Sequence, residues 1–203
     1  MIHVSGTVQK ETLRARRLLV IDDLQTLCQR LRTSDRAALE EVFRRLREPL
    51  LRYVCAIVED ATTAHDLVQD VFLDLWLRRT TLNPKQPLRP YLYRMARNRA
   101  LRYLRDERRR ARKRAEHLPR GLLTEPLLPD AHLESRQLET LLARWLEELP
   151  ERQREVLVLS RWHGLSHREI AHVMGISPRT VNNHMLRALE TLRQRLRAFA
   201  LMP

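Results

Sequence analysis

Glycine, β-branched residues and alternating patterns are scarce in this sequence. Its 203 residues include only four glycines, whereas leucine, arginine, alanine and glutamate are abundant. Those residues are good helix formers, and no segment alternates apolar and polar side chains for the length of a strand. The chain is long enough for one large domain or two small ones, each with its own core. We therefore expect an all-α protein.

Cysteine and long apolar runs are scarce as well. Cys28 and Cys55 lie in helical, partly apolar contexts without a CxxC pair, which predicts small buried thiols in a reducing compartment. No apolar run has the length of a transmembrane helix, and LLVI at residues 18–21 is too short for a signal-peptide core. These absences predict a cytoplasmic protein.

Acidic residues are fewer than basic ones, and the formal net charge is therefore +13. Such an excess predicts a polyanionic partner, most often nucleic acid. Between Arg94 and Arg114, eleven Lys or Arg residues accompany two acidic ones. On a helix, Arg94, Arg97, Asn98 and Arg105 share one broad face, and the ring of Tyr91 precedes it. Basic groups for phosphates beside rings for unstacked bases predict contact with single-stranded nucleic acid.

Proline clusters divide the chain into segments. Three prolines mark a loop over residues 80–90, and three more with a glycine mark an interdomain linker within residues 117–130. We therefore expect two small helical domains joined by a flexible linker. Their expected bounds are a leader at residues 1–21, a first domain at 22–114, the linker at 115–132 and a second domain at 133–203.

Local signals place the individual helices. Helical periodicity begins near residue 22 and resumes at residue 36, with Ser34 or Asp35 as the N-cap. Pro49 is expected to bend or divide this run, and Thr62 or Thr63 to cap the next helix, which ends near residue 79. A long basic helix is expected from residue 91 to about 114. In the second domain one helix stops at Pro150, and the next is expected to end with Gly164 as its C-cap.

The stretch LSHREIAHVMGISPRTVNNHMLRALETLRQRLR, residues 165–197, has helix-turn-helix spacing. Ser166 and Glu169 are spaced as a capping box, Gly175 supplies the turn, and Ser177 followed by Pro178 begins a second helix. The exposed start of that helix carries side chains that hydrogen-bond bases and phosphates: Arg179, Thr180, Asn182, Asn183 and Arg187. The segment therefore predicts DNA binding.

The segment HDLVQDVFLDLW, residues 65–76, has two contrasting faces on a helical wheel. Val68, Val71, Phe72 and Leu75 form the apolar stripe that packs on a core. The opposite face carries Asp66, Asp70, Leu73 and Leu77, with Gln69 at its border. A solvated face does not need leucines between aspartates. The pattern predicts a partner for this face, either another protein or further segments of the same chain.

The order of these segments resembles the extracytoplasmic-function sigma factors of bacterial RNA polymerase. AHDLVQDVFLDLW, residues 64–76, is similar to the sigma region 2.2 helix, with matches at Asp66, Gln69, Asp70 and Phe72. RPYLYRMARNRALRYLR, residues 89–105, is similar to regions 2.3–2.4. LPERQREVLVLSRWHGLSHREIAHVMGIS, residues 149–177, is similar to region 4. The resemblance covers about residues 34–112 and 135–197.

The resemblance implies a sigma factor that binds core RNA polymerase, at the β′ clamp and the β flap, and starts transcription of a specific regulon. It implies core-polymerase contacts by Asp66, Gln69, Asp70, Leu73 and Leu77. It implies −10 contacts by Tyr91, Arg94, Arg97, Asn98 and Arg105, with a flipped base in the 80–90 loop. It implies −35 contacts by Ser177, Arg179, Thr180, Asn182, Asn183 and Arg187. An anti-sigma factor is an expected partner. No catalytic residue, cofactor, metal or small-molecule substrate is expected.

Two other classes of protein share parts of this pattern. ISPRTVNNH, residues 176–184, also resembles LuxR/GerE-type regulators, but these need a receiver or ligand-binding domain with strands, and residues 34–112 show no strand pattern. A metalloenzyme would need ligands such as His163, His167 and His172, or Asp66, Asp70 and Asp74. The histidines lack HExxH spacing and the carboxylates lack supporting His or Cys, so the sigma-factor interpretation is preferred.

Overall fold

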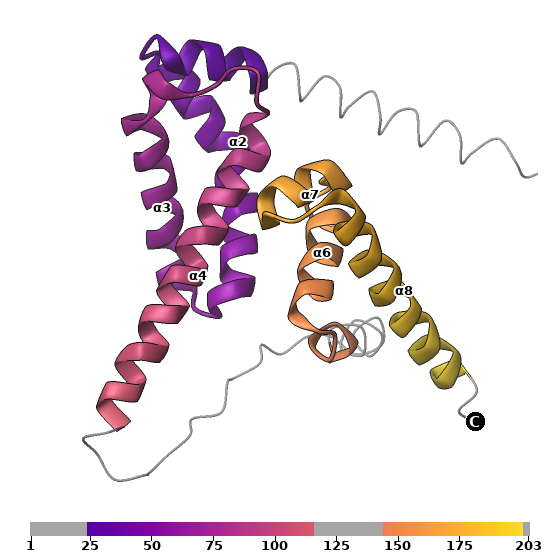
Figure 1. Ribbon diagram of the computed structural model, residues 1–203. Coiled ribbons are helices and arrows are strands. Elements are labelled where there is room, and N and C mark those ends of the chain that lie inside the picture. Colours follow the sequence, from indigo (N-terminus) through magenta and orange to yellow (C-terminus); the bar gives the residue numbers. More distant parts are fainter. Residues whose placement is uncertain (1–23, 116–143, 201–203) are drawn as a thin grey trace, which may run out of the picture. The chain divides into compact units, whose positions relative to one another are not determined.

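The computed structural model describes residues 24–115 and 144–200, which contain helices and no strand (Figure 1). The all-α expectation is confirmed. The expected leader at residues 1–21, residues 116–132 of the expected linker and residues 133–143 lie outside the described residues. The chain divides into two units between Glu107 and Arg108, within one helix, and each unit is described by itself.

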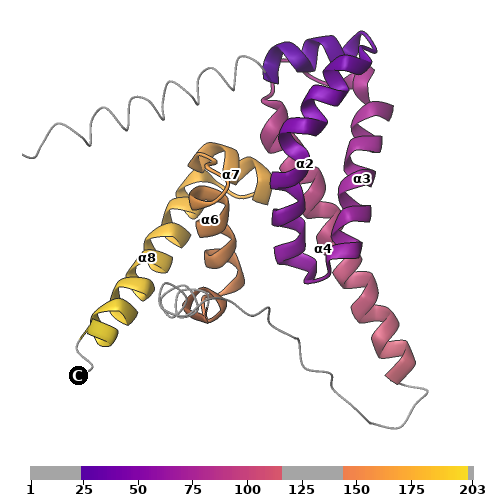
Figure 2. The same cartoon turned by 180° about the vertical axis from the view of Figure 1, so that it is seen from behind.

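The first unit is a helical bundle around an apolar core. A helix at residues 24–32 precedes α2 (Arg36–Val58), α3 (Ala61–Leu77), the short 3-10 helix η1 (Arg79–Thr81) and α4 (Leu88–Ala115), of which the part up to Glu107 belongs to this unit. Figures 1 and 2 show residues 24–32 lying across one end of α2, α3 and α4. The fully buried side chains include Leu31, Leu50, Tyr53, Val71, Leu75, Leu92 and Tyr93. The rings of Tyr53 and Tyr93, with centroids 5.3 Å apart, join α2 to α4.

Aspartates cap both α2 and α3. Asp35 is extended and accepts a hydrogen bond from the Ala38 amide, which confirms one of the two expected caps. Asp60 accepts from the Thr63 amide at 2.6 Å, so the expectation of a cap at Thr62 or Thr63 is wrong. Glu59 already ends α2 in the left-handed conformation, which leaves the extended Asp60 in the capping position. Both threonines belong to the first turn of α3.

The prolines of this unit disturb the helices less than expected. Pro49 lies inside α2, which continues through it as one helix, so the expected division is wrong. α4 begins at Leu88 rather than at residue 91, with Pro90 in its first turn. A missing amide there removes no intrahelical hydrogen bond, because the first amides of a helix have no partner within it. The loop expected over residues 80–90 is therefore shorter, between η1 and Leu88.

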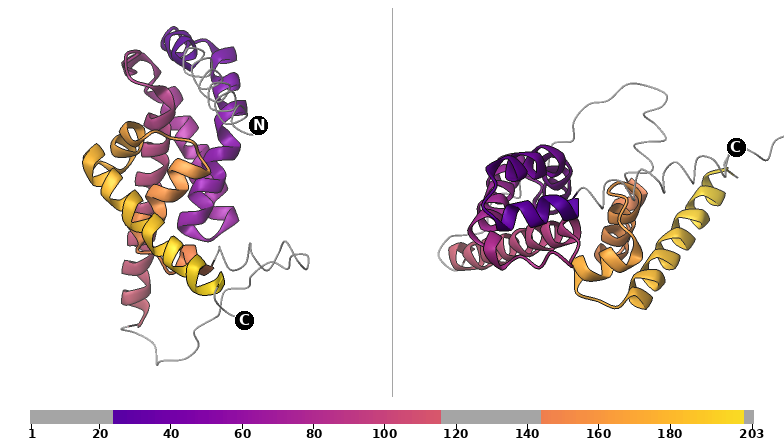
Figure 3. Two further views of the ribbon diagram at one scale, coloured as in Figure 1. Left: turned by 90° about the vertical axis from the view of Figure 1, so that its right-hand side faces the viewer. Right: turned by 90° about the horizontal axis from the view of Figure 1, so that it is seen from above.

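The second unit contains helical residues 144–147, α6 (Glu151–Arg161), α7 (His167–Met174) and α8 (Pro178–Ala200). The last three pack against one another, and Figure 3 shows α8 as their long member. α6 ends at Arg161 with Trp162 as its C-cap, so the expected cap at Gly164 is wrong. Gly164 nevertheless has a φ of 59° and reverses the chain, since the Leu165 amide donates back to the Leu159 carbonyl at 3.0 Å.

Candidate nucleic-acid and protein interfaces

The outward side of α3, here called the α3 outer face, consists of Asp66, Gln69, Asp70, Leu73 and Leu77. All five side chains are exposed, and the two leucines have exposed fractions of 56% and 64%. The opposite side of the helix is buried at Val68, Val71, Phe72 and Leu75, as the helical wheel predicts. Exposed leucines that alternate with carboxylates make a mixed apolar and acidic strip, a composition suited to docking another protein.

The ring of Phe72 points into the first unit rather than onto the α3 outer face. Its exposed fraction is 5%, and it makes an edge-to-face contact with Phe43 of α2 at a centroid distance of 4.8 Å. Arg47 lies 5.8 Å above the Phe43 ring. Phe72 therefore supports the α3 outer face from behind, although the sequence motif includes it with the surface residues.

Arg99 of α4 is bound to the acidic residues of α3. Its Nη1 donates to Asp70 Oδ2 at 2.8 Å, and its Nη2 donates to Asp74 Oδ2 at 2.7 Å. The exposed fractions of the Asp70 and Asp74 side chains are 52% and 26%. Sequence reasoning missed this link, because an ion pair across 25 to 29 residues leaves no local signal. Asp70 therefore joins α3 to α4 through its ion pair with Arg99 and is also an exposed member of the α3 outer face.

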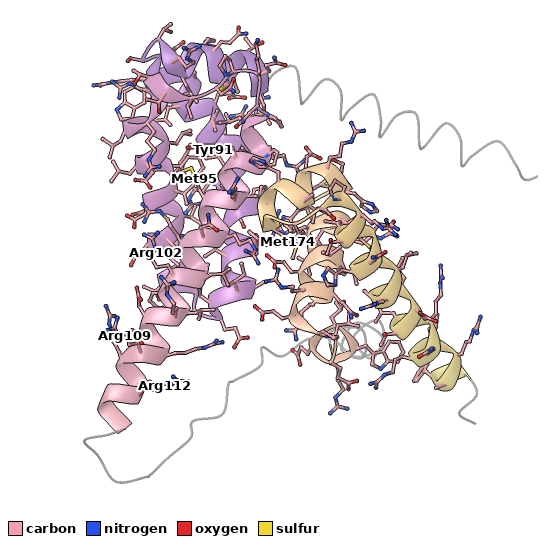
Figure 4. The ribbon with its side chains drawn as sticks, viewed as in Figure 1. Tyr91, Met95, Arg102, Arg109, Arg112 and Met174 are labelled. Carbon is pink, nitrogen blue, oxygen red and sulfur yellow. The ribbon has the colours of Figure 1, made fainter. Side chains whose placement is uncertain are left out.

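The outward side of α4, here called the α4 outer face, carries the expected −10 residues. Arg94, Asn98 and Arg105 are exposed, whereas Tyr91 and Arg97 are half-buried. Leu92, Tyr93, Ala96 and Ala100 are buried on the other side. Arg102 is exposed one turn after Asn98 and adds a cation beyond the expected residues. Figure 4 shows Tyr91, Met95, Arg102, Arg109 and Arg112 succeeding one another along α4.

A cavity of about 120 Å³ lies where the loop before α4 meets the first helix. It is lined by Cys28, Thr81, Leu82, Asn83, Gln86, Leu88 and Tyr91. The Asn83 side chain shapes the loop, because its Oδ1 accepts from the Lys85 amide at 3.0 Å. Polar groups from the loop together with Tyr91 in the lining suit a planar polar ligand such as a nucleobase.

Cys28 forms the wall of this cavity that comes from residues 24–32. Its side chain is 1% exposed, and burial raises the pKa of the thiol, against a smaller opposing effect of the Arg32 charge. Cys28 and Cys55 are both free, and Cys55 is half-buried rather than buried. The wall was missed because only the folded chain brings residue 28 to the loop before α4.

The helix-turn-helix geometry of the second unit follows the expected capping chemistry. Ser166 and Glu169 form a complete capping box, in which the Ser166 amide donates to the Glu169 carboxylate at 2.7 Å. Gly175 has a φ of 66° and ends α7 in the left-handed conformation. The Thr180 amide donates to Ser177 Oγ at 3.0 Å, which places Ser177 before Pro178 at the start of α8. The turn and both helix starts are confirmed.

The start of α8 separates a buried side from an exposed one. Val181, Met185 and Ala188 are buried against the rest of the unit, whereas Leu189 and Leu192 are half-buried. Arg179, Asn182, Asn183 and Arg187 are exposed, and Thr180 is half-buried. Ser177 is exposed, but its hydroxyl is already hydrogen-bonded to Thr180. The exposed side therefore presents two arginines and two asparagines, which suit the major groove.

The described ranges also bear on metal chemistry and membrane insertion. They contain no group of three or more His, Cys, Asp or Glu side chains able to hold a metal ion. His163 is buried, while His167 and His172 are half-buried. Among residues 24–115 and 144–200, no helix combines the length and apolarity that crossing a bilayer requires.

Comparison with known proteins connects both units to one family. A model of Sigma-70 region 2 matches residues 42–110, and a model of Sigma-70, region 4 matches residues 139–192. The RNA polymerase sigma-E factor of Streptomyces coelicolor is 35% identical over 157 residues, which are 77% of this chain and 85% of that protein. The chain belongs to the extracytoplasmic-function group of RNA polymerase sigma factors.

Further similarities agree with this assignment. The sigma factor is 25% identical to the ECF RNA polymerase sigma factor SigM of Bacillus subtilis, over 79% of this chain and 93% of SigM. Its fold matches CnrH, solved with the cytosolic domain of CnrY, at a TM-score of 0.62 and 24% identity, over 87% and 99% of the two chains. It also matches RpoE of Bartonella quintana, solved with the anti-sigma factor NepR, at a TM-score of 0.58 and 20% identity, over 78% and 96%.

The family settles the class of function. The sigma factor acts in the initiation of transcription, and the alternative of a LuxR/GerE-type regulator is not favoured, because region 2 and region 4 are both matched.

Proposed function

We propose that this sigma factor binds core RNA polymerase through the α3 outer face, contacts the −10 element through the α4 outer face and contacts the −35 element through the start of α8. The observation that carries the proposal is the exposure of Leu73 and Leu77 beside Asp66 and Asp70, on a helix whose other side is fully packed. An apolar strip edged by acids fits a helical protein surface with complementary basic groups. The β′ clamp is the proposed site on the polymerase.

The proposed −10 contacts are of two kinds, to the DNA backbone and to a base. Arg94, Asn98 and Arg105 are exposed and suit phosphates and sugars of the −10 element, with Arg94 and Asn98 nearest the tyrosine ring that would hold an opened strand. Tyr91 lines the cavity before α4, so its ring is placed to stack on a base that enters there. Arg97 borders this face and is proposed to support the same contacts.

The −35 contacts belong to the exposed side of α8. Asn182 and Asn183 suit adenine edges, while Arg179 and Arg187 suit guanine edges or phosphates. Ser177 and Thr180 lie at the N-terminal end of the helix, where backbone amides and short hydroxyls favour a phosphate. The proposal assigns polymerase and −10 binding to residues 22–114, linkage to 115–132 and −35 binding to 133–203.

Further partners and location complete the proposal. An anti-sigma factor is proposed to hold the protein inactive, as the partners of structurally similar sigma factors suggest, and the β flap is proposed as a second polymerase contact. We place the protein in the cytoplasm with its polymerase and assign it no catalysis of its own, since nucleotide addition belongs to the polymerase.

Reconstitution tests this proposal. The full chain is mixed with core polymerase, its affinity is measured by titration, and run-off transcription is followed on a set of candidate promoters. Leu73→Arg with Leu77→Arg is expected to abolish core binding, because charged side chains would replace the apolar centre of the interface. The protein stays folded by circular dichroism, since both leucines are exposed.

Leu186→Arg is the matched control for the binding titration. Leu186 has the same 56% exposed fraction as Leu73 but lies on α8. Core affinity is expected to survive this control substitution. Wild-type protein that fails to bind core polymerase refutes the function, and unaltered affinity of the Leu73 and Leu77 variant refutes the α3 assignment.

A further inference from the structure

The end of α4 forms a basic arm, defined here as residues 105–112. Arg105, Arg108, Arg109 and Arg112 are all exposed, and no described α4 side chain after Ala100 is buried. Figures 1 and 3 show this end of α4 extending past α2 and α3. At 1.5 Å per residue, the twelve residues that follow Ala100, up to Arg112, extend about 18 Å. Burial of side chains therefore does not account for the arm.

Two pairs of arginines in the arm repel each other along the helix. Arg105 and Arg109 are spaced i,i+4, as are Arg108 and Arg112, and like charges at this spacing destabilise a helix. The acidic residues within the arm are Asp106 and Glu107 only. A polyanion laid along the helix would relieve the repulsion between arginines, so charge complementarity points to nucleic acid phosphates.

The composition of the arm favours a duplex over a single strand. Binding of unstacked bases combines basic groups with aromatic rings, and the arm RDERRRAR contains no aromatic residue. The rings of α4 lie earlier, at Tyr91, Tyr93 and Tyr103. Arginines without rings or paired amides suit phosphates, whose contacts position a protein without reading sequence.

The chain order indicates which duplex. The α4 outer face is assigned to the −10 element, and the polypeptide continues from the arm into the unit assigned to the −35 element, which lies upstream. We propose that the basic arm binds phosphates of the promoter duplex immediately upstream of the −10 element. At 1.5 Å per residue the eight residues of the arm extend about 12 Å, which corresponds to about three to four base pairs at 3.4 Å each. The location on the promoter rests on the proposed function, whereas duplex binding by the arm does not.

The first experiment measures salt dependence with the full chain and a 30-base-pair duplex of random sequence. Arg109→Gln with Arg112→Gln removes two phosphate contacts, so the slope of log affinity against log salt is expected to fall by about 1.8, twice the 0.9 released per phosphate. Glutamine is a good helix former, and both side chains are exposed, so folding is preserved. An unchanged slope overturns the arm as a duplex-binding element.

Arg32→Gln with Arg36→Gln is the matched control. These two arginines are also exposed but lie outside α4, and their removal is expected to leave the slope unchanged. An equal fall of the slope in both double variants shows a general effect of net charge and overturns the proposal.

The second experiment places the contact on a promoter. Neutral methylphosphonates replace about four phosphates upstream of the −10 element, the span of the arm at 3.4 Å per base pair, in a promoter that supports run-off transcription, and binding of the reconstituted holoenzyme is measured. The wild type is expected to lose affinity at least tenfold, whereas the Arg109 and Arg112 variant loses little more. Equal sensitivity of both proteins overturns the location. A changed salt slope in a protein that does not bind core polymerase instead refutes the proposed function and keeps duplex binding by the arm.

Discussion

The outer faces of α3 and α4 belong to neighbouring helices of one bundle, yet their chemistry is opposite. Inward, both helices bury small and branched apolar residues, such as Val71 of α3 and Ala96 of α4. Outward, α3 exposes leucines between aspartates, whereas α4 exposes arginines and Asn98. The shared core determines the inner residues, so the outer difference reports what each helix meets outside the bundle: a protein surface for α3 and a polyanion for α4.

Arg99 lies at the border of the two faces. It stands on the basic helix but is bound to Asp70 and Asp74 of the acidic one. One acidic side chain of the α3 outer face is therefore already partly neutralised within the bundle. The substitutions below separate its external role from its internal one.

Charge reversal on α3 is expected to have the largest effect. Asp66→Arg with Asp70→Arg is expected to weaken core-polymerase binding at least about 30-fold, because disrupting a buried charge pair at an interface costs roughly 2–5 kcal/mol and 1.4 kcal/mol corresponds to tenfold. Fluorescence titration with core polymerase measures this loss. Binding to random duplex DNA is not expected to fall, since the added charge is positive.

The two single substitutions separate the loss of polymerase binding from the loss of fold stability. Asp66→Arg should weaken core binding at unchanged melting temperature, whereas Asp70→Arg should also destabilise the fold by placing a second guanidinium beside Arg99. Arg94→Glu with Arg105→Glu on α4 is the mirror control, which should weaken DNA binding and leave core binding intact. Wild-type core affinity in the double Asp variant would contradict the contrast between the two faces.

Removal of the Tyr91 ring should have the next largest effect. Tyr91→Ala is expected to weaken binding of holoenzyme to an opened −10 strand by about 5- to 150-fold, since stacking of one base contributes roughly 1–3 kcal/mol. Tyr91→Phe keeps the ring and should retain most of the affinity. Fluorescence anisotropy with a single-stranded −10 oligonucleotide distinguishes them, and equal affinities for all three proteins would remove Tyr91 from the interface.

Much of the fold could be predicted because it depends on local rules. Period-3.6 apolar spacing located the inner side of α3, and cap residues located the starts of α2, α7 and α8. The errors arose where two local signals competed. Thr62 and Asp60 are both good caps, and only the left-handed turn at Glu59 decides between them. Pro90 suggested a loop, but the first turn of α4 tolerates it.

The candidate site was predictable only as separate faces. Exposure of Asp66, Leu73, Arg94 and Asn182 follows from helical periodicity, because each lies opposite a buried stripe. Contacts between distant segments do not follow from periodicity. The Arg99 ion pairs and the Cys28 wall of the cavity depend on how helices pack, which no local pattern encodes. The roles of these side chains in binding stay predictions.

The ion pairs of Arg99, between the two outer faces, predict a smaller effect on the free energy of unfolding. In a double-mutant cycle of unfolding free energies, Arg99→Gln and Asp74→Asn should couple by about 0.5–1 kcal/mol, and Arg99→Gln with Asp70→Asn by less. The difference is expected because Asp70 is twice as exposed as Asp74, so solvent screens its pair more strongly. Urea denaturation measures both cycles. Equal coupling would show that exposure does not distinguish the two aspartates.

The smallest expected effect concerns how the two helices begin. α3 starts at Asp60, whose pKa is lowered by hydrogen bonds from the Thr63 hydroxyl and the Thr63 amide, whereas the first turn of α4 contains no acidic residue. A lowered folded pKa stabilises the fold above the ordinary value of 3.8, and that stability is lost as the pH falls through the folded pKa.

Asp60→Asn keeps an acceptor but does not titrate. The wild type should therefore melt a few degrees higher than Asp60→Asn at pH 7, and this advantage should shrink below about pH 4. Asp35, whose pKa is lowered mainly by Arg30, remains in both proteins, so the difference between their melting curves isolates Asp60. A difference that stays constant from pH 7 to pH 2 would show that the start of α3 does not depend on this charge.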